Sequence, residues 1–144
     1  MPSIQKSNRS YVLDANALIS FIEHRPIAGE KVRHLFARAL QRDQRLLMSA
    51  VNWGEVLYIT WRYHGDRGGR SAETTLQQLP IAVISADQGR ASRAAELKHK
   101  HSLGYAGAFA AELSIERGAW LVTADTEFLK VGKILSIYQL PRYE

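Results

Sequence analysis

YVLDANALISFI, residues 11–22, opens with a three-residue apolar run and passes directly into a helical pattern. Residues 11–13 are predicted to form a buried strand and residues 15–22 the helix that follows it, with Asp14 between them. A strand that runs straight into a helix is the unit from which parallel sheets are built, because parallel strands need a long crossover connection. The stretch therefore predicts an α/β fold.

The same alternation of short apolar runs and helical patterns continues along the chain. Within residues 30–41 the apolar side chains recur at i, i+3, i+4, i+7 and i+8, which is the spacing of an amphipathic helix. We predict an α/β fold with a parallel five-stranded sheet flanked by helices on both faces. The predicted strands are residues 11–13, 46–48, 81–84, 120–123 and 134–137, and the predicted helices are residues 15–22, 30–41, 51–63, 71–78, 89–100, 105–117 and 127–131.

The length of 144 residues is typical of one domain, and we expect residues 1–144 to form it. Residues 1–9 are predicted to be a loose N-terminal lead-in, and the Gly- and Arg-rich residues 64–70 a polar loop. A hydrophobic content of 46% is enough for a buried core and excludes a disordered chain. The absence of cysteine excludes a disulfide scaffold, a Cys-ligated zinc site and a thiol nucleophile.

A formal net charge of +5 favours a polyanionic partner, nucleic acid before membrane. No apolar run is long enough to span a membrane, and the first residues lack the apolar segment of a secretory signal. We therefore expect a cytoplasmic protein with no membrane partner. Two groups of basic residues are candidates for contacts with an RNA backbone, although each also fits an ordinary solvated surface. They are Lys31, Arg38, Arg42 and Arg45 on one helix, and Arg62, Arg67 and Arg70 around the polar loop.

Three carboxylates are predicted to meet at the carboxyl edge of the sheet, where functional groups of such folds gather. Asp14 directly follows the first strand, Asp125 follows the fourth, and Glu55 lies one turn into the helix after the second. Grouped carboxylates repel one another unless a cation is bound, and a set of oxygen ligands favours Mg²⁺ or Mn²⁺. Such an ion activates water for attack on a phosphodiester. The alternative is that the aspartates are simple N-caps and Glu55 an ordinary helical glutamate.

Polar residues close to these acids have two interpretations each. Asn16 either holds a ligand in place or bonds to the start of its helix, and Asn52 has the same ambiguity at the start of another helix. Thr123 either orients Asp125 through its hydroxyl or is an ordinary strand residue. Glu127 is either an auxiliary acid or a first-turn glutamate favoured by the helix dipole.

Three segments resemble, in order, the motifs of a PIN domain: YVLDANAL (residues 11–18), SAVNWGEVL (residues 49–57) and LVTADTEF (residues 121–128). More narrowly, the chain resembles VapC-type toxins of bacterial type II toxin–antitoxin pairs, over about residues 11–137. The resemblance implies a PIN-like parallel sheet, a Mg²⁺- or Mn²⁺-dependent endoribonuclease acting on RNA, a cognate antitoxin and a homodimer. It also implies that Asp14, Glu55 and Asp125 are the catalytic metal ligands.

The chain departs from the family pattern at Gly107, where the family places an aspartate early in a long helix. The stretch reads LGYAGAF here, and no residue one turn away on that helix is acidic. Glu112 lies five residues on, about 140° round the helix, so the ligand is expected to be missing. A poorer placement of metal and water would slow the reaction, so Gly107→Asp is predicted to cleave RNA faster.

Two alternatives to an active nuclease remain open. One is a catalytically inactive module on the same fold that binds RNA or the antitoxin. The other is a phosphotransfer domain, since such proteins also have an aspartate after the first strand. Haloacid-dehalogenase-like enzymes need a second aspartate where Asn16 stands, and receiver domains need an acidic pair where SNRS (residues 7–10) stands, so this second alternative is disfavoured.

Overall fold

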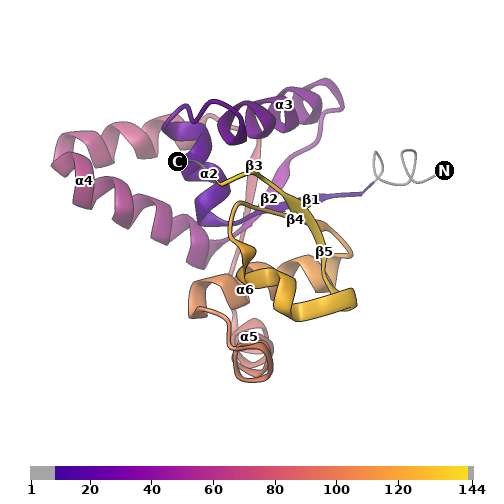
Figure 1. The fold of residues 1–144 in the computed structure, drawn as a ribbon. Coiled ribbons are helices and arrows are strands. Elements are labelled where there is room, and N and C mark those ends of the chain that lie inside the picture. The colour runs from indigo at the N-terminus through magenta and orange to yellow at the C-terminus, as the bar shows by residue number, and fades with distance from the viewer. Residues whose placement is uncertain (1–8, 143–144) are drawn as a thin grey trace.

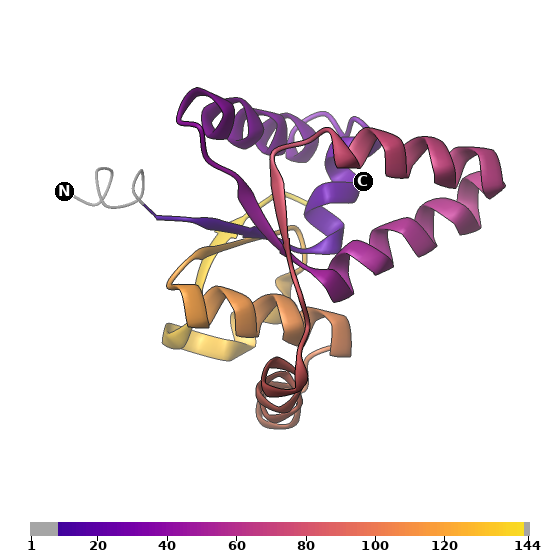
Figure 2. The same ribbon diagram turned by 180° about the vertical axis from the view of Figure 1, so that it is seen from behind.

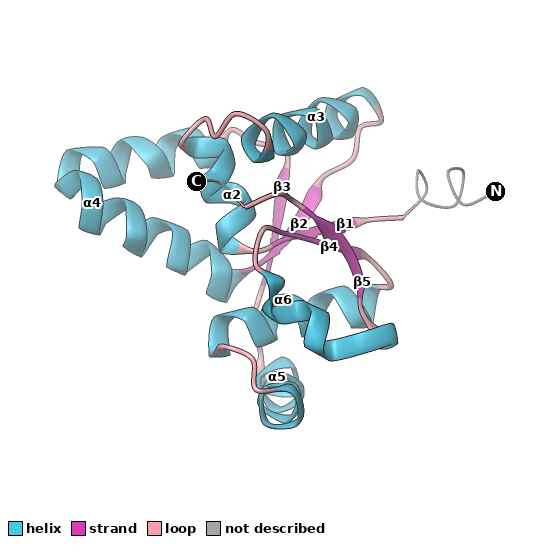
Figure 3. Ribbon diagram, viewed as in Figure 1, coloured by secondary structure: helices cyan, strands magenta, loops and turns pink. Residues whose placement is uncertain are grey.

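The structure is a computed structural model that describes residues 9–142. Five parallel strands form one sheet in the order β3-β2-β1-β4-β5, which confirms the predicted fold class (Figures 1 and 3). The chain builds the sheet outward from β1 to β3 and then returns to its other side for β4 and β5. Strands β1 and β4 are therefore neighbours at the point where the strand order reverses. The strands are β1 (Tyr11–Leu13), β2 (Leu46–Ser49), β3 (Ile81–Ile84), β4 (Trp120–Thr123) and β5 (Ser136–Gln139).

Helices cover both faces of the sheet, as Figures 1 and 2 show from opposite sides. One face carries α2 (Ala15–Ile22), α3 (Ala28–Gln41) and α4 (Ala50–Gln77), and the other carries α5 (Gln88–His101), α6 (Tyr105–Arg117) and the 3₁₀ helix η1 (Thr126–Ile134). Within residues 9–142, no helix combines the length and the apolar character that crossing a bilayer requires.

The two central strands are buried on both faces. Leu13 and Val122 pair across β1 and β4 and pack with α2, α3 and α4. Val12 and Leu121 pair one position earlier and pack with α5, α6 and η1, because successive strand side chains point to opposite faces. This register brings the carboxyl ends of β1 and β4 side by side, so the residues that follow these strands lie close together.

Helix α4 corrects the prediction of a polar loop at residues 64–70. The helix is interrupted only at Gly65, whose φ of 70° favours glycine, and it resumes immediately afterwards. The second half turns back toward the sheet, where Leu76 is buried (Figure 1). A side chain at Gly69 would overlap the ring of Trp61, so this glycine lets the two halves of α4 approach each other. The Gly-rich segment that was predicted to be a loop is therefore the bend of a helical hairpin.

The fifth strand is displaced from its predicted position of residues 134–137 and runs from Ser136 to Gln139. Helix η1 continues past a non-helical Gly132, which has a φ of 80°, and ends at Ile134. Ile134 is 59% exposed, so its apolar side chain does not belong to the sheet core. The strand prediction therefore began two residues too early.

The start of the described chain is fixed to the sheet. Arg9, the last residue of the predicted lead-in, donates hydrogen bonds to the carbonyl oxygen of Gly118 and to Oγ of Ser136, over 3.1 and 2.9 Å. Its guanidinium group also lies 4.4 Å from the ring centroid of Trp120. Arg9 is thus attached to the sheet, and the rest of the predicted lead-in, residues 1–8, lies outside the described residues.

Candidate active site

A cleft of about 650 Å³ opens at the carboxyl edge of the sheet. It lies beyond the ends of β1 and β4, where the strand order reverses and where α/β sheets bind their ligands. Both halves of the sequence contribute to it, because α2, α4, α6 and η1 all border it. Its lining includes the three predicted acids and the position of the missing fourth: Asp14, Glu55, Asp125 and Gly107.

Asp14 combines the two roles that its sequence position allows. One carboxylate oxygen, Oδ1, accepts a hydrogen bond of 2.8 Å from the backbone N–H of Ala17 and so caps α2. The other, Oδ2, accepts a hydrogen bond of 2.5 Å from the hydroxyl of Thr123. The pKa of Asp14 is raised to about 7, mainly by burial and to a lesser extent by the negative charges of Asp125 and Glu55, while the hydrogen bonds from Thr123 and Ala17 oppose the rise. Asp14 is therefore an N-cap whose carboxylate also lies in an unfavourable electrostatic environment.

Thr123 connects the acids that follow the two central strands. While its hydroxyl donates to Asp14, the same oxygen accepts the backbone N–H of Asp125 over 2.9 Å. Asp125 in turn caps η1, since its Oδ1 accepts the backbone N–H of Glu127 over 2.9 Å. The hydroxyl of Thr123 thus holds the backbone of Asp125, whereas the carboxylate that it orients is that of Asp14.

Glu55 and Asn52 enter the cleft from the first turns of α4, which begins directly after β2. Burial is the main cause of the raised pKa of Glu55, and the charge of Glu127 adds to it, whereas a hydrogen bond with Asn52 lowers it. Asn52 is 1% exposed, and its Nδ2 donates to the carbonyl oxygen of Ala106 over 3.0 Å. Its Oδ1 has no hydrogen-bond partner among the described residues. The cleft therefore contains a buried acceptor that the chain leaves unsatisfied.

Gly107 lies on the first turn of α6 and forms part of the cleft wall. Glu127 reaches this part of the wall from η1, and its Oε1 accepts the backbone N–H of Gly104 at the start of α6 over 2.9 Å. A Cβ atom built on Gly107 would lie 3.2 Å from Oε2 of Glu127 and 3.1 Å from Cζ of Phe128. The carboxylate of Glu127, which belongs to η1, therefore lies next to Gly107, the position at which the family pattern predicts an aspartate.

Basic and polar side chains border the same cleft. Asn16 lines it, and its Oδ1 accepts a hydrogen bond of 3.3 Å from Arg25, which also lines it. Arg62 lies on α4 and donates to the hydroxyl of Tyr58 over 3.2 Å. Arg62 was among the predicted RNA-binding residues, whereas nothing in the sequence singles out Arg25, whose position depends on the turn between α2 and α3.

The remaining predicted basic residues do not line this cleft. Arg38, Arg42 and Arg45 line a separate pocket of about 220 Å³ together with Arg9. This pocket lies where β1 and β2 begin, at the amino edge of the sheet, opposite the carboxylates. A role for this group in RNA binding stays a prediction. The other three are exposed on the outer parts of α3 and α4: Lys31, Arg67 and Arg70.

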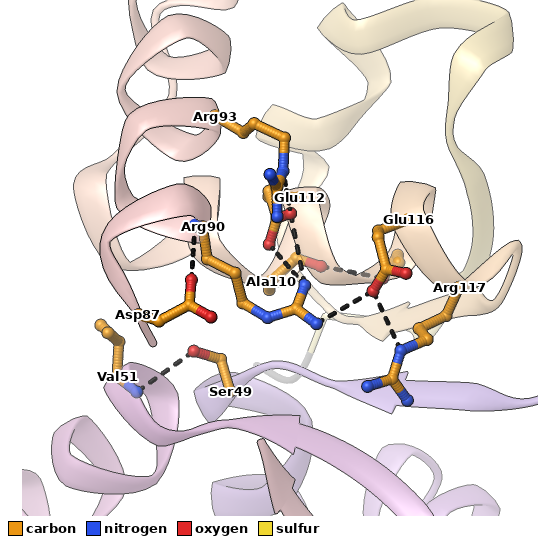
Figure 4. Close-up of polar contacts among 10 residues, drawn as sticks. Ser49, Val51, Asp87, Arg90, Arg93, Ala110, Glu112, Glu116 and Arg117 are labelled. Carbon is orange, nitrogen blue, oxygen red and sulfur yellow. Dashed lines mark hydrogen bonds and ion pairs between the residues drawn. The ribbon is translucent and has the colours of Figure 1, made fainter. Parts of the chain in front are cut away.

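A second group of acids lies on the far side of α6 and is fully paired (Figure 4). The side chain of Glu112 is 2% exposed, and its two oxygens receive Arg90 and Arg93 over 3.2 and 2.8 Å. Arg90 also pairs with Glu116 over 3.0 Å, so two arginines of α5 neutralise two glutamates of α6. Glu112 therefore faces α5 and not the cleft, as its helical spacing from Gly107 predicted.

The donor chemistry of the cleft fits a divalent cation. Within residues 9–142, no salt bridge joins Asp14, Glu55 or Asp125 to an arginine or lysine. In the same part of the chain, no three acidic or histidine side chains are close enough to hold an ion by themselves. Mg²⁺ commonly binds through one or two carboxylates and keeps several waters. The carboxylates and the unsatisfied Oδ1 of Asn52 supply the oxygen ligands that such an ion prefers.

The family model described as PIN domain matches residues 11–134 of this chain. The chain belongs to the PIN domain family. The family expected from the three motifs is thereby confirmed, and the match includes all the acids that line the cleft. Within this PIN domain, the cleft at the carboxyl edge is the candidate active site.

Sequence relatives and solved structures that are similar to this chain are consistent with its membership of the PIN domain family. Ribonuclease VapC30 of Mycobacterium tuberculosis and a VapC ribonuclease of Mycobacterium bovis are each 27% identical to this chain over 124 residues, which is 81% of this chain and 91% of the relative. Among solved structures, VapBC2 from Rickettsia felis bound to a promoter DNA fragment has a TM-score of 0.69 at 15% identity, covering 90% of this chain and 98% of the other. VapC20 of Mycobacterium tuberculosis, a sarcin–ricin loop cleaving toxin, has a TM-score of 0.69 at 16% identity, covering 85% and 95%. These structures show that the chain has the fold of VapC proteins.

Proposed function

We propose that this PIN-domain protein is a metal-dependent endoribonuclease of the VapC type, which uses Mg²⁺ or Mn²⁺ and is held in check by a cognate antitoxin. The observation that carries the proposal is the convergence of Asp14, Glu55 and Asp125 in one cleft without an arginine or lysine paired to any of them in the described chain. Relatives named as ribonucleases support RNA as the substrate. Solved VapBC complexes with the same fold support a protein partner.

Asp14, Glu55 and Asp125 would hold the cation, with Oδ1 of Asn52 as a neutral oxygen close by. A bound divalent ion supplies a polarised phosphodiester and a water of lowered pKa for in-line attack. Thr123 keeps the Asp14 carboxylate in one orientation through its short hydrogen bond. Such fixed geometry matters because catalytic groups must be held close to the productive arrangement before the substrate binds.

Arg62 and Tyr58 would contact the RNA beside the bond that is cleaved. They lie one turn apart on α4, both line the cleft, and Tyr58 is 60% exposed. An arginine contributes a phosphate contact, and an exposed aromatic ring provides a surface on which an unpaired base stacks. This pair favours single-stranded RNA, whose bases are free to stack, over a duplex.

The resemblance also leads us to propose a homodimer and a cytoplasmic location. The cysteine-free composition agrees with the second of these. Light scattering during size-exclusion chromatography tests the first, and fractionation of cells that produce the protein tests the second.

A single-turnover cleavage assay tests the proposed function. The wild type should cleave a single-stranded RNA in Mn²⁺ and should stop when EDTA is added. Asp14→Asn and Asp125→Asn should each slow cleavage by roughly 100-fold or more. Asp87→Asn is the matched control, because Asp87 caps α5 outside the cleft and asparagine caps equally well.

Two outcomes of this assay would contradict the proposal. Cleavage by Asp14→Asn at the wild-type rate would show that the cleft is not the active site. Absence of cleavage of every RNA offered, by a wild type that still binds Mn²⁺, would favour the inactive module that binds RNA or an antitoxin.

A further inference from the structure

We propose that Glu127 is the fourth carboxylate of the cation-binding cleft, and that Gly107 is the residue that makes room for it. The inference rests on the proposed function only in taking the cleft as a cation site. In this chain, helix α6 contributes space and a backbone N–H to the cleft, while the acid itself comes from η1. Gly107 is then part of a working arrangement and not the mark of a lost ligand.

Two contacts place the Glu127 carboxylate. Its Oε1 accepts the N–H of Gly104, the N-cap residue of α6, over 2.9 Å. The first turn of α6 carries no acidic residue of its own, so Glu127 provides the negative charge that a helix N-terminus favours. Its Oε2 lies beside the bare Cα of Gly107 on the wall of the cleft. One oxygen thus fixes the side chain, and the other, which accepts no hydrogen bond from the described residues, is left for a ligand.

Gly107 gives this placement room that a larger residue would reduce. Its hypothetical Cβ would lie 3.2 Å from Oε2 of Glu127 and 3.1 Å from Cζ of Phe128. Phe128 is 1% exposed and packed in the core between α6 and the sheet, so its ring has little freedom to move. Glu127 is partly exposed, and it is therefore the side chain that any residue larger than glycine would displace.

An independent observation indicates that a ligand belongs at this wall of the cleft. Asn52 donates through its Nδ2 to the carbonyl oxygen of Ala106, the neighbour of Gly107, and its Oδ1 has no partner among the described residues although the residue is only 1% exposed. A buried acceptor without a partner is unfavourable, because it has lost its hydrogen bonds to water. A cation or its water shell that lies between Asn52 and Glu127 would satisfy this oxygen, since both line the same cleft.

Glu127→Gln separates a ligand role from a capping role. Glutamine has nearly the same volume and still offers Oε1 to the N–H of Gly104, but it has no charge. By isothermal titration with Mn²⁺ alone, Glu127→Gln should bind the ion about 10- to 100-fold more weakly than the wild type. Its thermal stability without metal should be unchanged or higher. If Glu127 served only as a cap, Mn²⁺ affinity would not change, and that result overturns the proposal.

Substitutions at position 107 test the claim about space. Gly107→Asp should bind Mn²⁺ no more tightly than the wild type, since the new side chain displaces Glu127; this reverses the expectation drawn from the family pattern. Gly107→Asp combined with Glu127→Ala should bind more tightly than Glu127→Ala alone, because the acid is then carried by α6. Tighter binding by the single Gly107→Asp variant overturns the proposal, as does a double variant that binds no better than Glu127→Ala. Circular dichroism of each variant confirms that the fold is retained.

Asp14→Asn shows which proposal has failed if Glu127→Gln has no effect. If Asp14→Asn abolishes Mn²⁺ binding while Glu127→Gln does not weaken it, the cleft is a cation site without Glu127. If neither variant affects Mn²⁺ binding, the cleft is not the cation site and the proposed function fails as well.

Discussion

Helix α6 separates two groups of carboxylates that the protein treats in opposite ways. On one side, the paired group is neutralised within the chain by two arginines of α5 (Figure 4). On the other side, the cleft group has no salt bridge to an arginine or lysine among the described residues. The paired group is Glu112 and Glu116, and the cleft group is Asp14, Glu55, Asp125 and Glu127.

The difference distinguishes a structural charge from a functional one. A buried carboxylate is stable when a cation and hydrogen bonds satisfy it, and Glu112 has both from its own chain. Asp14 is as buried as Glu112, but no salt bridge joins it to an arginine or lysine among the described residues; burial, with a smaller contribution from the charges of Asp125 and Glu55, raises its pKa to about 7. Arginines thus form salt bridges with one group, whereas none is formed with the other among the described residues although Arg25 and Arg62 line the same cleft, and this difference supports the proposed cation site.

The largest effect is expected from breaking the paired group. Glu112→Gln removes the buried carboxylate that pairs with Arg90, whose side chain is 14% exposed, and breaking such a pair costs about 3–5 kcal/mol. Urea denaturation should show this loss in the free energy of unfolding. A loss below about 1 kcal/mol would mean that the pair contributes no more than a surface salt bridge.

The cleft group should respond in the opposite direction. Without metal, Asp14→Asn should raise the free energy of unfolding by at least about 1 kcal/mol at pH 8, because it removes a buried charge that lies beside like charges. The folded-state pKa of about 7 exceeds the ordinary value of 3.8, so the wild type loses stability as the pH rises between these values. The advantage of the variant should therefore vanish below about pH 4. Thermal melts across this range test it, and a variant less stable than the wild type at pH 8 would contradict the comparison.

The smallest effect is expected from Glu116→Gln, which is the matched control for Glu112. The side chain of Glu116 is 43% exposed, and water screens its contact with Arg90. The expected loss is below about 1 kcal/mol in the same urea experiment. If Glu116→Gln were as damaging as Glu112→Gln, burial would not be what distinguishes the two glutamates.

The sequence pattern was sufficient to predict those features of the fold that depend on residues adjacent in the chain. The run from Tyr11 to Leu18 indicated a strand and a helix, and it placed Asp14 at the carboxyl edge. The helix predicted over residues 105–117 has these bounds and is capped by Gly118, whose φ is 59°. Periodicity and capping determine these features, and both are written in adjacent residues.

Features that depend on contacts between distant residues were missed. The hairpin of α4 requires Gly69 to accommodate Trp61, and a Gly-rich segment gives no sign of that contact. The approach of Glu127 to Gly107 joins residues on two different elements, so helical spacing along α6 could not reveal it. The unsatisfied Oδ1 of Asn52 is likewise visible only when the surroundings of the amide are known.

The thermal response to Mn²⁺ tests most directly whether the cleft group takes its cation from outside. Near 100 times the dissociation constant, Mn²⁺ should add about 2.7 kcal/mol and raise the Tm of the wild type by roughly 5 °C or more. Glu112→Gln should melt at a lower temperature but show the same rise, whereas Asp14→Asn should show none. An equal rise in Asp14→Asn, or no rise in the wild type, would contradict the account.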